Sequence, residues 1–240
     1  MATFTLLHGA YHGGWCWHAV ASILRARGHA VTTPTQTGLG ERRHLLSPAI
    51  TLSTFADDLI EHLRAEDLTD TVLVGHSFGG CAIAKAAEVA HTRIARLVFL
   101  DAIVLHGDET PFDCFAPEVT AARTEQALAH DGGLSIPPPP PAAFGVTDPA
   151  MAAAIAPRLT PHPLRTYQTS LALQGPTGAG LPLCYVRCTD PSYPALDWAL
   201  ARAQAADWRI ETLATGHDCM VTAPEATADL LEAEAARPRV

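Results

Sequence analysis

The sequence predicts a doubly wound α/β sheet of about six mostly parallel strands, and three observations lead to this fold class. Short apolar runs alternate along the chain with amphipathic stretches, as a parallel sheet covered by helices requires. Most of these runs are rich in Val, Leu, Ile or Phe, which is typical of strands buried on both faces. With 240 residues, of which 48% are hydrophobic, the chain is long enough for one domain with a substantial core.

The apolar runs expected to form the strands are residues 3–7, 30–33, 71–74, 96–100, 183–187 and 209–213. Between them, a helix is expected from about residue 17 to Gly28, because glycine readily adopts the left-handed conformation of a helix cap. Between positions 52 and 63, Leu and Phe recur at spacings of three and four residues, which predicts an amphipathic helix. A closing helix from about 224 to 236 opens on Pro and Glu, which suit a first turn.

One segment interrupts this alternation. From about residue 103 to 180 we find no convincing strand, and prolines accumulate, including five in a row at 137–141 that favour polyproline II. The segment is too long for a simple connection within a compact domain. We therefore expect a core of residues 1–102 and 181–240, with residues 103–180 inserted as a cap. Its aromatic side chains either line a substrate pocket or only fasten the cap to the body; they are Phe112, Phe115, Phe144 and Tyr167.

Several classes of protein are excluded by composition. A formal net charge of −9 argues against nucleic-acid binding, which needs a basic face. No apolar run reaches about eighteen residues, so we expect no membrane span, and the first residues do not resemble a signal peptide. Six scattered cysteines without a CxxC pair favour reduced thiols in the cytoplasm. The sequence contains no HExxH motif, which argues against a metal site of that kind. We therefore expect a cytoplasmic protein that uses no metal or cofactor and binds a small molecule.

Residues 75–80, Gly-His-Ser-Phe-Gly-Gly, follow one predicted strand and precede an alanine-rich, helix-like run. This is the setting of the G-x-S-x-G nucleophile elbow, a sharp strand-to-helix turn that exposes the serine oxygen at the carboxyl edge of the sheet. The N–H groups of the following helix also favour negative charge there. The motif thus predicts that Ser77 is a nucleophile rather than an incidental serine in a glycine-rich turn.

A serine hydroxyl needs a base, and the base needs an acid that orients it. His217 lies just after the last predicted strand, so it should reach the same sheet edge as Ser77. Asp190 follows the strand at 183–187 and gives the chain order Ser, Asp, His that this kind of site requires. Asp101, at the end of the strand at 96–100, is the alternative acid. We prefer Asp190 on chain position alone.

The negative oxygen that forms during acyl transfer needs two fixed hydrogen-bond donors. We expect them to be the backbone N–H groups of Phe78, directly after the nucleophile, and of Ala10, in the turn after the first strand. Loss of one such donor typically costs about 3 kcal/mol of transition-state stabilisation.

With these motifs the chain resembles the α/β-hydrolases, and within them the plant methylesterase and hydroxynitrile-lyase branch with its bacterial esterase relatives. The matching stretches are residues 7–17, 37–42, 75–80, 97–102 and 216–217. The resemblance implies a fold that lacks the first two strands of larger members, and it suggests a homodimer. Within the first matching stretch, we expect Gly9 and Tyr11 to contact substrate.

Together these assignments predict a cofactor-independent serine esterase that cleaves small, largely uncharged esters of methyl, aryl or carbamate type through an acyl-enzyme. The related hydroxynitrile lyases carry threonine where Gly9 stands, and a lysine that helps to bind cyanide where Asp218 stands. An acidic Asp218 would disfavour that anion. A lyase or another C–C cleaving enzyme is therefore the alternative and not the main prediction. A ligand-binding receptor built on a hydrolase fold is a further alternative.

Overall fold

The computed structural model describes residues 1–238 and contains a central parallel sheet of six strands in the order β2-β1-β3-β4-β7-β8. In chain order the strands are β1 (Thr3–Leu7), β2 (Ala30–Thr32), β3 (Thr71–His76), β4 (Ile94–Leu100), β7 (Leu183–Cys188) and β8 (Arg209–Leu213). Each lies where the sequence predicted it, within two residues at either end. The predicted fold class is therefore confirmed.

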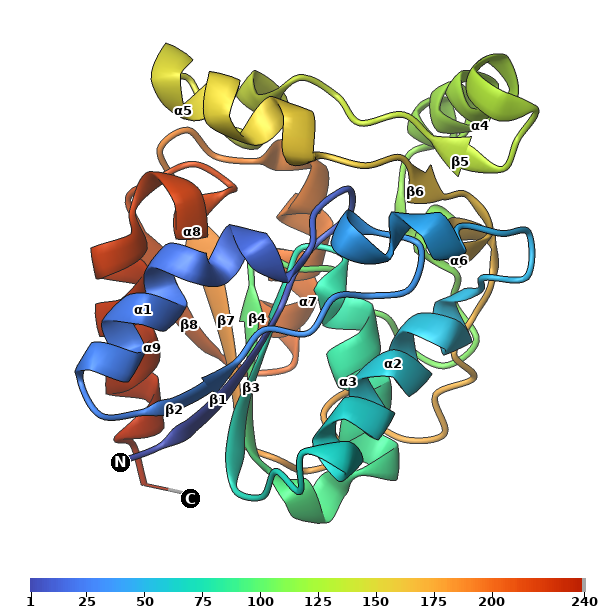
Figure 1. The fold of residues 1–240 in the computed structure, drawn as a ribbon. Coiled ribbons are helices and arrows are strands. Elements are labelled where there is room, and N and C mark those ends of the chain that lie inside the picture. Colours follow the sequence, from blue (N-terminus) through green and yellow to red (C-terminus); the bar gives the residue numbers. More distant parts are fainter. Residues whose placement is uncertain (239–240) are drawn as a thin grey trace.

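Helices cover both faces of the sheet (Figure 1). One face carries α1 (His18–Ala26), α8 (Cys219–Thr222) and α9 (Pro224–Ala235), and the other carries α2 (Leu52–Ala65), α3 (Gly79–Val89) and α7 (Asp197–Ala205). Side chains of β3 alternate between the two apolar cores: Val72 and Val74 face the first set of helices, and Leu73 faces the second. Burial on both faces explains why the strands have continuous apolar sequences. None of the described helices is long and apolar enough to cross a membrane.

The helix ends follow local chemistry. Thr51 and Thr54 form a capping box at the start of α2, in which each side chain bonds the backbone of the other residue. The helix α1 ends at Ala26, and Gly28 then adopts a left-handed φ of 86° that reverses the chain into β2. The predicted end at Gly28 thus marks the turn after the helix.

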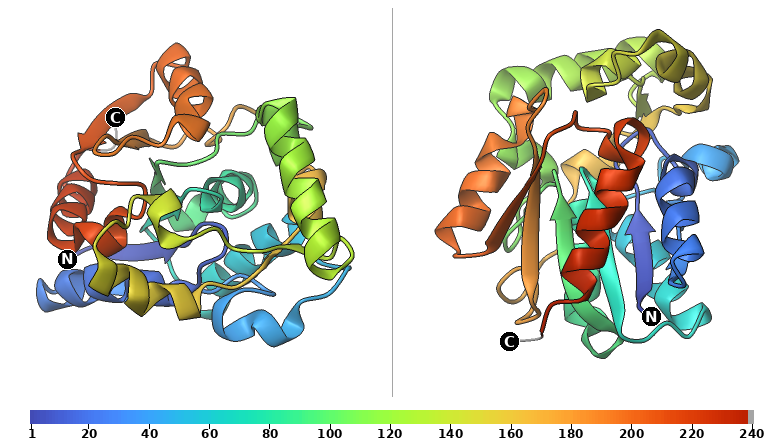
Figure 2. Two further views of the ribbon diagram at one scale, coloured as in Figure 1. Left: turned by 90° about the horizontal axis from the view of Figure 1, so that it is seen from above. Right: turned by 90° about the vertical axis from the view of Figure 1, so that its left-hand side faces the viewer.

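Within the segment at 103–180, residues 117–163 lie across the carboxyl edge of the sheet (Figure 2), and residues 171–180 return beside α3 (Gly79–Val89) towards the opposite edge. The segment contains α4 (Pro117–Asp131), α5 (Pro149–Ile155), α6 (Arg165–Gln168) and an antiparallel pair of short strands, β5 (Ser135–Ile136) and β6 (His162–Pro163). Two-residue strands are too short to leave an alternating pattern, so the sequence did not reveal them. The segment is joined to the turn after β1, because the Thr160 N–H donates to the Tyr11 carbonyl at 2.9 Å.

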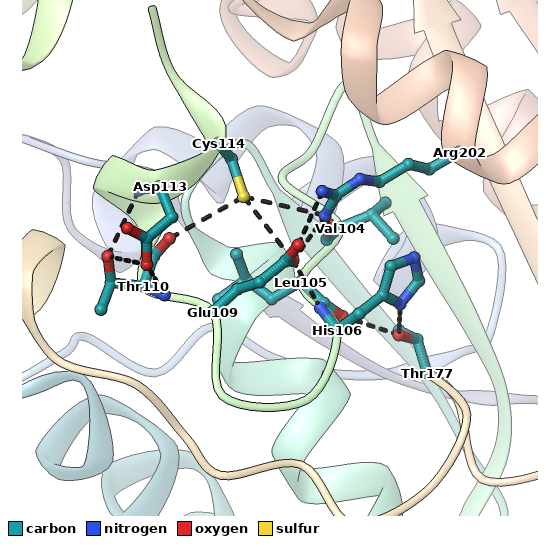
Figure 3. A network of polar contacts seen from close by, with 9 residues as sticks. All are labelled: Val104, Leu105, His106, Glu109, Thr110, Asp113, Cys114, Thr177 and Arg202. Atoms are coloured by element: carbon teal, nitrogen blue, oxygen red, sulfur yellow. Dashed lines mark hydrogen bonds and ion pairs between the residues drawn. The ribbon is translucent and has the colours of Figure 1, made fainter. Parts of the chain in front are cut away.

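The two ends of this segment are tied to each other and to α7 (Figure 3). Arg202 of α7 donates to both carboxylate oxygens of Glu109, at 2.6 and 2.8 Å, and to the Val104 carbonyl at 2.9 Å. Near the return to the sheet, the Thr177 hydroxyl donates to the Leu105 carbonyl at 2.7 Å. The chain is thus held where it leaves the sheet and where it comes back.

Candidate active site

Ser77 lies in a tight turn between β3 and α3. Its backbone has a left-handed φ of 52°, which a residue other than glycine rarely adopts. The Ser77 N–H donates to the Leu100 carbonyl at 3.1 Å, and the Ser77 carbonyl accepts from the N–H groups of Gly80 at 3.2 Å and Ile103 at 3.0 Å. The turn is therefore held by its own helix and by the chain that leaves β4.

The turn after β1 passes very close to Ser77. A Cβ atom added at Gly9 would lie 2.7 Å from the Ser77 Cβ, and one added at Gly79 would lie 2.8 Å from the His8 carbonyl oxygen. Only glycine permits such contacts without a shift of the backbone. This close approach brings Ala10, which follows Gly9, to the side of Ser77.

Three side chains form a hydrogen-bonded chain at this edge. The Ser77 Oγ lies 2.9 Å from His217 Nε2, and His217 Nδ1 lies 2.7 Å from Asp101 Oδ2. Because a carboxylate only accepts, Nδ1 carries the ring proton and Nε2 is left to accept the hydroxyl proton of the serine. Asp101 is fully buried, and His217 is 2% exposed. The arrangement can remove the proton from Ser77 as its oxygen attacks an electrophile.

The expected contact between Asp190 and His217 is not formed. The two ring nitrogens of His217 are already engaged by Ser77 and Asp101. Asp190 is exposed beyond the end of β7, where its N–H donates to the Thr215 carbonyl at 3.1 Å and continues the pairing with the chain after β8. The preference for Asp190 is therefore corrected in favour of the alternative, Asp101.

Strand register explains why Asp101 takes this position. His76 and Leu100 are paired neighbours on β3 and β4, so the next residue of each strand, Ser77 and Asp101, leaves the sheet beside the other. Arg187 of β7 lies behind the carboxylate, with its guanidinium nitrogen 3.2 Å from Asp101 Oδ1. The buried carboxylate thus has both a cationic and an imidazole partner, as a buried charge requires.

Two further residues that the sequence analysis did not assign hold His217, one at its ring and one at its backbone. Tyr193 stacks on the imidazole with 4.1 Å between ring centroids and 21° between ring planes. At the backbone of His217, the neutral His76 ring donates its Nε2 proton to the carbonyl oxygen at 3.0 Å. Burial, followed by repulsion from His217, lowers the pKa of His76 well below its usual value.

A buried ion pair connects the two loops that flank Ser77. His12 Nε2 lies 3.0 Å from Asp218 Oδ2, and His12 Nδ1 donates to the Ala10 carbonyl at 2.7 Å. Burial disfavours the charged imidazole, yet the Asp218 carboxylate outweighs it and raises the pKa of His12. Burial likewise opposes ionisation of Asp218, but His12 lowers the pKa of that carboxyl. The pair joins the loop that carries Ala10 to the loop that carries His217.

The Ser77 and His217 side chains open on a cavity of about 30 Å³. Its lining is mostly aromatic and includes Tyr11, Phe115, Phe144, Tyr167 and Tyr193. Ala10 and Phe78 line the same cavity, and Phe78 precedes the first residue of α3. Two residues expected at the substrate lie outside this lining: Phe112 packs on the Tyr167 ring at 5.1 Å, and Gly9 packs against Ser77.

Within residues 1–238, no group of three or more His, Cys, Asp or Glu side chains is arranged to hold a metal ion. The side chains of Ser77, His217 and Asp101 are instead hydrogen-bonded to one another.

Sequence comparisons identify relatives along the whole chain. A sequence model of the Alpha/beta hydrolase family matches residues 6–230. The chain is 37% identical to a carbendazim hydrolyzing esterase of Nocardioides sp. (strain SG-4G), over 97% of this chain and 99% of that relative. It is 32% identical to putative methylesterase 14, chloroplastic, of Arabidopsis thaliana, over 56% of this chain and 40% of that relative.

Solved structures with the same fold cover nearly all of the chain. An extracellular alpha/beta-hydrolase from a Paenibacillus species, described as sharing structural and functional homology with Tobacco Salicylic Acid Binding Protein 2, gives a TM-score of 0.85 at 25% identity, over 99% of this chain and 100% of that one. Tomato Methylketone Synthase I gives 0.81 at 20% identity over 98% and 97%, which shows the shared fold. The resemblance to the methylesterase branch is confirmed, and the chain belongs to the alpha/beta hydrolase family.

Proposed function

We propose that this protein is a serine esterase that hydrolyses small carboxylic esters through an acyl-enzyme. The observation that carries the proposal is the hydrogen-bonded chain from Ser77 through His217 to Asp101 at the base of the aromatic cavity. The similarity to a named esterase over 97% of the chain supports the same class of reaction.

In this mechanism His217 Nε2 takes the hydroxyl proton as Ser77 Oγ attacks the ester carbonyl. Asp101 keeps the proton on Nδ1 and stabilises the imidazolium. The N–H groups of Ala10 and Phe78 bind the negative oxygen of the tetrahedral intermediate. His217 then donates its new proton to the departing alkoxide, which leaves an acyl group on Ser77. Water, deprotonated by His217, attacks that acyl group, and the acid product leaves with the serine restored.

The cavity supports a preference for substrates with a small reacting group. A volume of about 30 Å³ accommodates little more than the ester carbonyl and its nearest atoms. Tyr11, Phe115 and Phe144 make the surroundings apolar, which suits methyl, aryl or carbamate-type esters. Residues 103–180 act as the cap in this proposal, because they supply Phe115, Phe144 and the rest of the upper wall.

Cyanohydrin cleavage receives less support. Asp218, in the position of the lyase lysine, is fully buried, lines the cavity and is held by His12. Unlike a lysine, this carboxylate supplies no cation to bind a departing cyanide ion, and its partner His12 is already engaged by it.

A stopped-flow trace with p-nitrophenyl acetate tests the hydrolase proposal. We expect a burst of nitrophenolate equal to the enzyme concentration, and labelling of Ser77 alone by a serine-directed sulfonyl fluoride, detected by mass spectrometry. Both signals should disappear in Ser77→Ala. Turnover of a cyanohydrin without a burst would instead favour the lyase, and the absence of both turnover and labelling would favour a receptor.

The acid is tested by a matched pair of variants. Asp101→Asn should lower kcat by about 10⁴-fold, because an amide cannot hold the imidazole in the productive tautomer. Asp190→Asn, at an exposed position away from His217, should leave kcat within about twofold of wild type. A large loss in Asp190→Asn, with near-normal turnover in Asp101→Asn, would reverse the assignment.

A further inference from the structure

Arg123 of α4 stands where the cavity over Ser77 meets a second, larger cavity. This outer cavity has a volume of about 620 Å³ and lies between α4 and the prolines at 137–140. The residues that line both cavities are Tyr11, Arg123, Phe144 and Tyr193. Because the inner cavity is small and the outer cavity adjoins it at these residues, the part of an ester beyond its reacting group has room to extend past Arg123.

The Arg123 guanidinium is fixed by aromatic rings and lacks a polar partner. Its central carbon lies 4.6 Å from the centroid of the Phe115 ring and 4.9 Å from that of Tyr167. Its Nη1 is buried and has no hydrogen-bond partner among residues 1–238. Leaving a buried donor without an acceptor costs free energy. A guanidinium carries five N–H donors in a rigid planar arrangement, which suits it to bind an oxygen acceptor. The rings therefore position an unused donor at the junction of the two cavities.

Within the part of the chain that the structure describes, the side chains around this junction place no buried anion beside the Arg123 guanidinium. The titratable side chains that face Arg123 from the surrounding elements are the phenols Tyr11, Tyr167 and Tyr193 and the imidazole His162. Burial raises the pKa of each phenol further above its usual range, and burial lowers the pKa of His162 well below its usual value, so all four are neutral at physiological pH. Glu118, five residues earlier on α4, lines the outer cavity but is exposed to solvent. An oxygen acceptor on the substrate would complete the hydrogen bonding of the guanidinium.

We propose that Arg123 is a specificity-determining residue, which binds a carbonyl or carboxylate oxygen of the substrate that is separate from the ester being cleaved. The inference rests on the proposed function, since it assumes an ester bound at Ser77, and it narrows the substrate class to esters with a second oxygen acceptor. Arg123 takes no part in bond cleavage: it holds the distal acceptor while Ser77 and His217 act on the ester.

Matched p-nitrophenyl esters test this role. The valerate has an alkyl chain, the levulinate a neutral ketone, and the hemiglutarate a carboxylate; a second series carries the same three groups on the alcohol side of an acetate ester. In wild type we expect kcat/KM for the ketone or carboxylate member to exceed that of the alkyl member by about ten- to a hundredfold in one series. The member with the larger gain identifies whether the acceptor is neutral or anionic.

Arg123→Met should remove this preference, so that the ratio between acceptor and alkyl esters falls to about one, and Arg123→Lys should keep part of it for the carboxylate only. Arg158→Met is the matched control, because Arg158 also covers an aromatic ring, Trp15 at 4.3 Å, but is not part of the lining of either cavity. It should leave the ratio unchanged. A preference that survives in Arg123→Met, or no preference in wild type, would overturn the proposal.

A binding measurement separates this proposal from the esterase proposal. In Ser77→Ala, calorimetry should show that methyl levulinate or monomethyl glutarate binds about tenfold more tightly than methyl valerate, and that the added substitution Arg123→Met abolishes the difference. If the esters bind in this way but are not hydrolysed by wild type, the esterase proposal fails while the role of Arg123 stands. Equal binding of all three esters overturns the role of Arg123, whatever the turnover.

Discussion

Replacing His8 by glutamine should make the protein less sensitive to acid. His8 is fully buried directly after β1, where its Nδ1 donates to the Gly9 carbonyl at 2.8 Å and its Nε2 accepts from the Gln36 N–H at 3.1 Å. A proton on Nε2 would therefore meet another N–H donor. Burial is the main reason why the pKa of His8 falls to about 3, so the ring stays neutral in the native protein.

The size of the effect follows from proton linkage. In the unfolded chain the imidazole has its ordinary pKa of 6.5, so between pH 6.5 and about 3 the unfolded state binds a proton that the native state does not. The stability contributed by neutral His8 is complete above pH 6.5 and falls by about 1.4 kcal/mol for each pH unit below it. At pH 5 the loss is about 2 kcal/mol. Glutamine cannot titrate, and its amide can both donate to the Gly9 carbonyl and accept from Gln36.

Urea unfolding at pH 7.5 and at pH 5 measures the pH-dependent contribution of His8 to the free energy of unfolding. We expect the free energy of unfolding to fall between the two pH values by about 2 kcal/mol less in His8→Gln than in wild type. Any pH-independent effect of the substitution cancels in this comparison. His18→Gln, at an exposed position of α1, should lose as much stability as wild type. Equal losses in wild type and His8→Gln would refute the claim that His8 is held neutral.

Three further substitutions probe the turn beside Ser77 and the attachment of residues 103–180 to α7. In Gly9→Ala, the new Cβ would lie 2.7 Å from the Ser77 Cβ and displace the serine, so we expect kcat with p-nitrophenyl acetate to fall by about tenfold or more; an unchanged kcat would show that the turn after β1 yields instead. Arg202→Met and Glu109→Gln should each lower the free energy of unfolding, and a double-mutant cycle should give a coupling of about 1 kcal/mol, because the two side chains share two charge-assisted hydrogen bonds. Strictly additive effects would mean that this pair does not fasten the segment to α7.

Much of the fold could be predicted because its signals are local. The six strands are apolar over their whole length, and a strand buried on both faces must be so. The turn at Ser77 is also encoded locally, by glycines at 75 and 79 on either side of the serine and by an alanine-rich helix after it. The segment at 103–180 was recognisable only as an interruption, since the proline run at 137–141 excludes a helix interior and a central strand without specifying another structure. Its two-residue strands pair with each other and are too short to leave an alternating pattern in the sequence.

The carboxylate partner of His217 and the position of Arg123 could not be predicted because neither depends on a local pattern. Asp101 and Asp190 both follow parallel strands and both give the order Ser, Asp, His. They are distinguished by register, since β3 and β4 end together at His76 and Leu100, whereas the chain after β7 continues along the chain after β8 as far as Asp190. An acid in the turn directly after the strand next to the nucleophile is therefore a stronger candidate than one that lies further along a loop. The position of Arg123 is even harder to predict from sequence. The helix α4 has few buried positions, so an arginine on its surface resembles any solvated cation. Only the fold places it over two rings, at the mouth of the cavity that Ser77 faces.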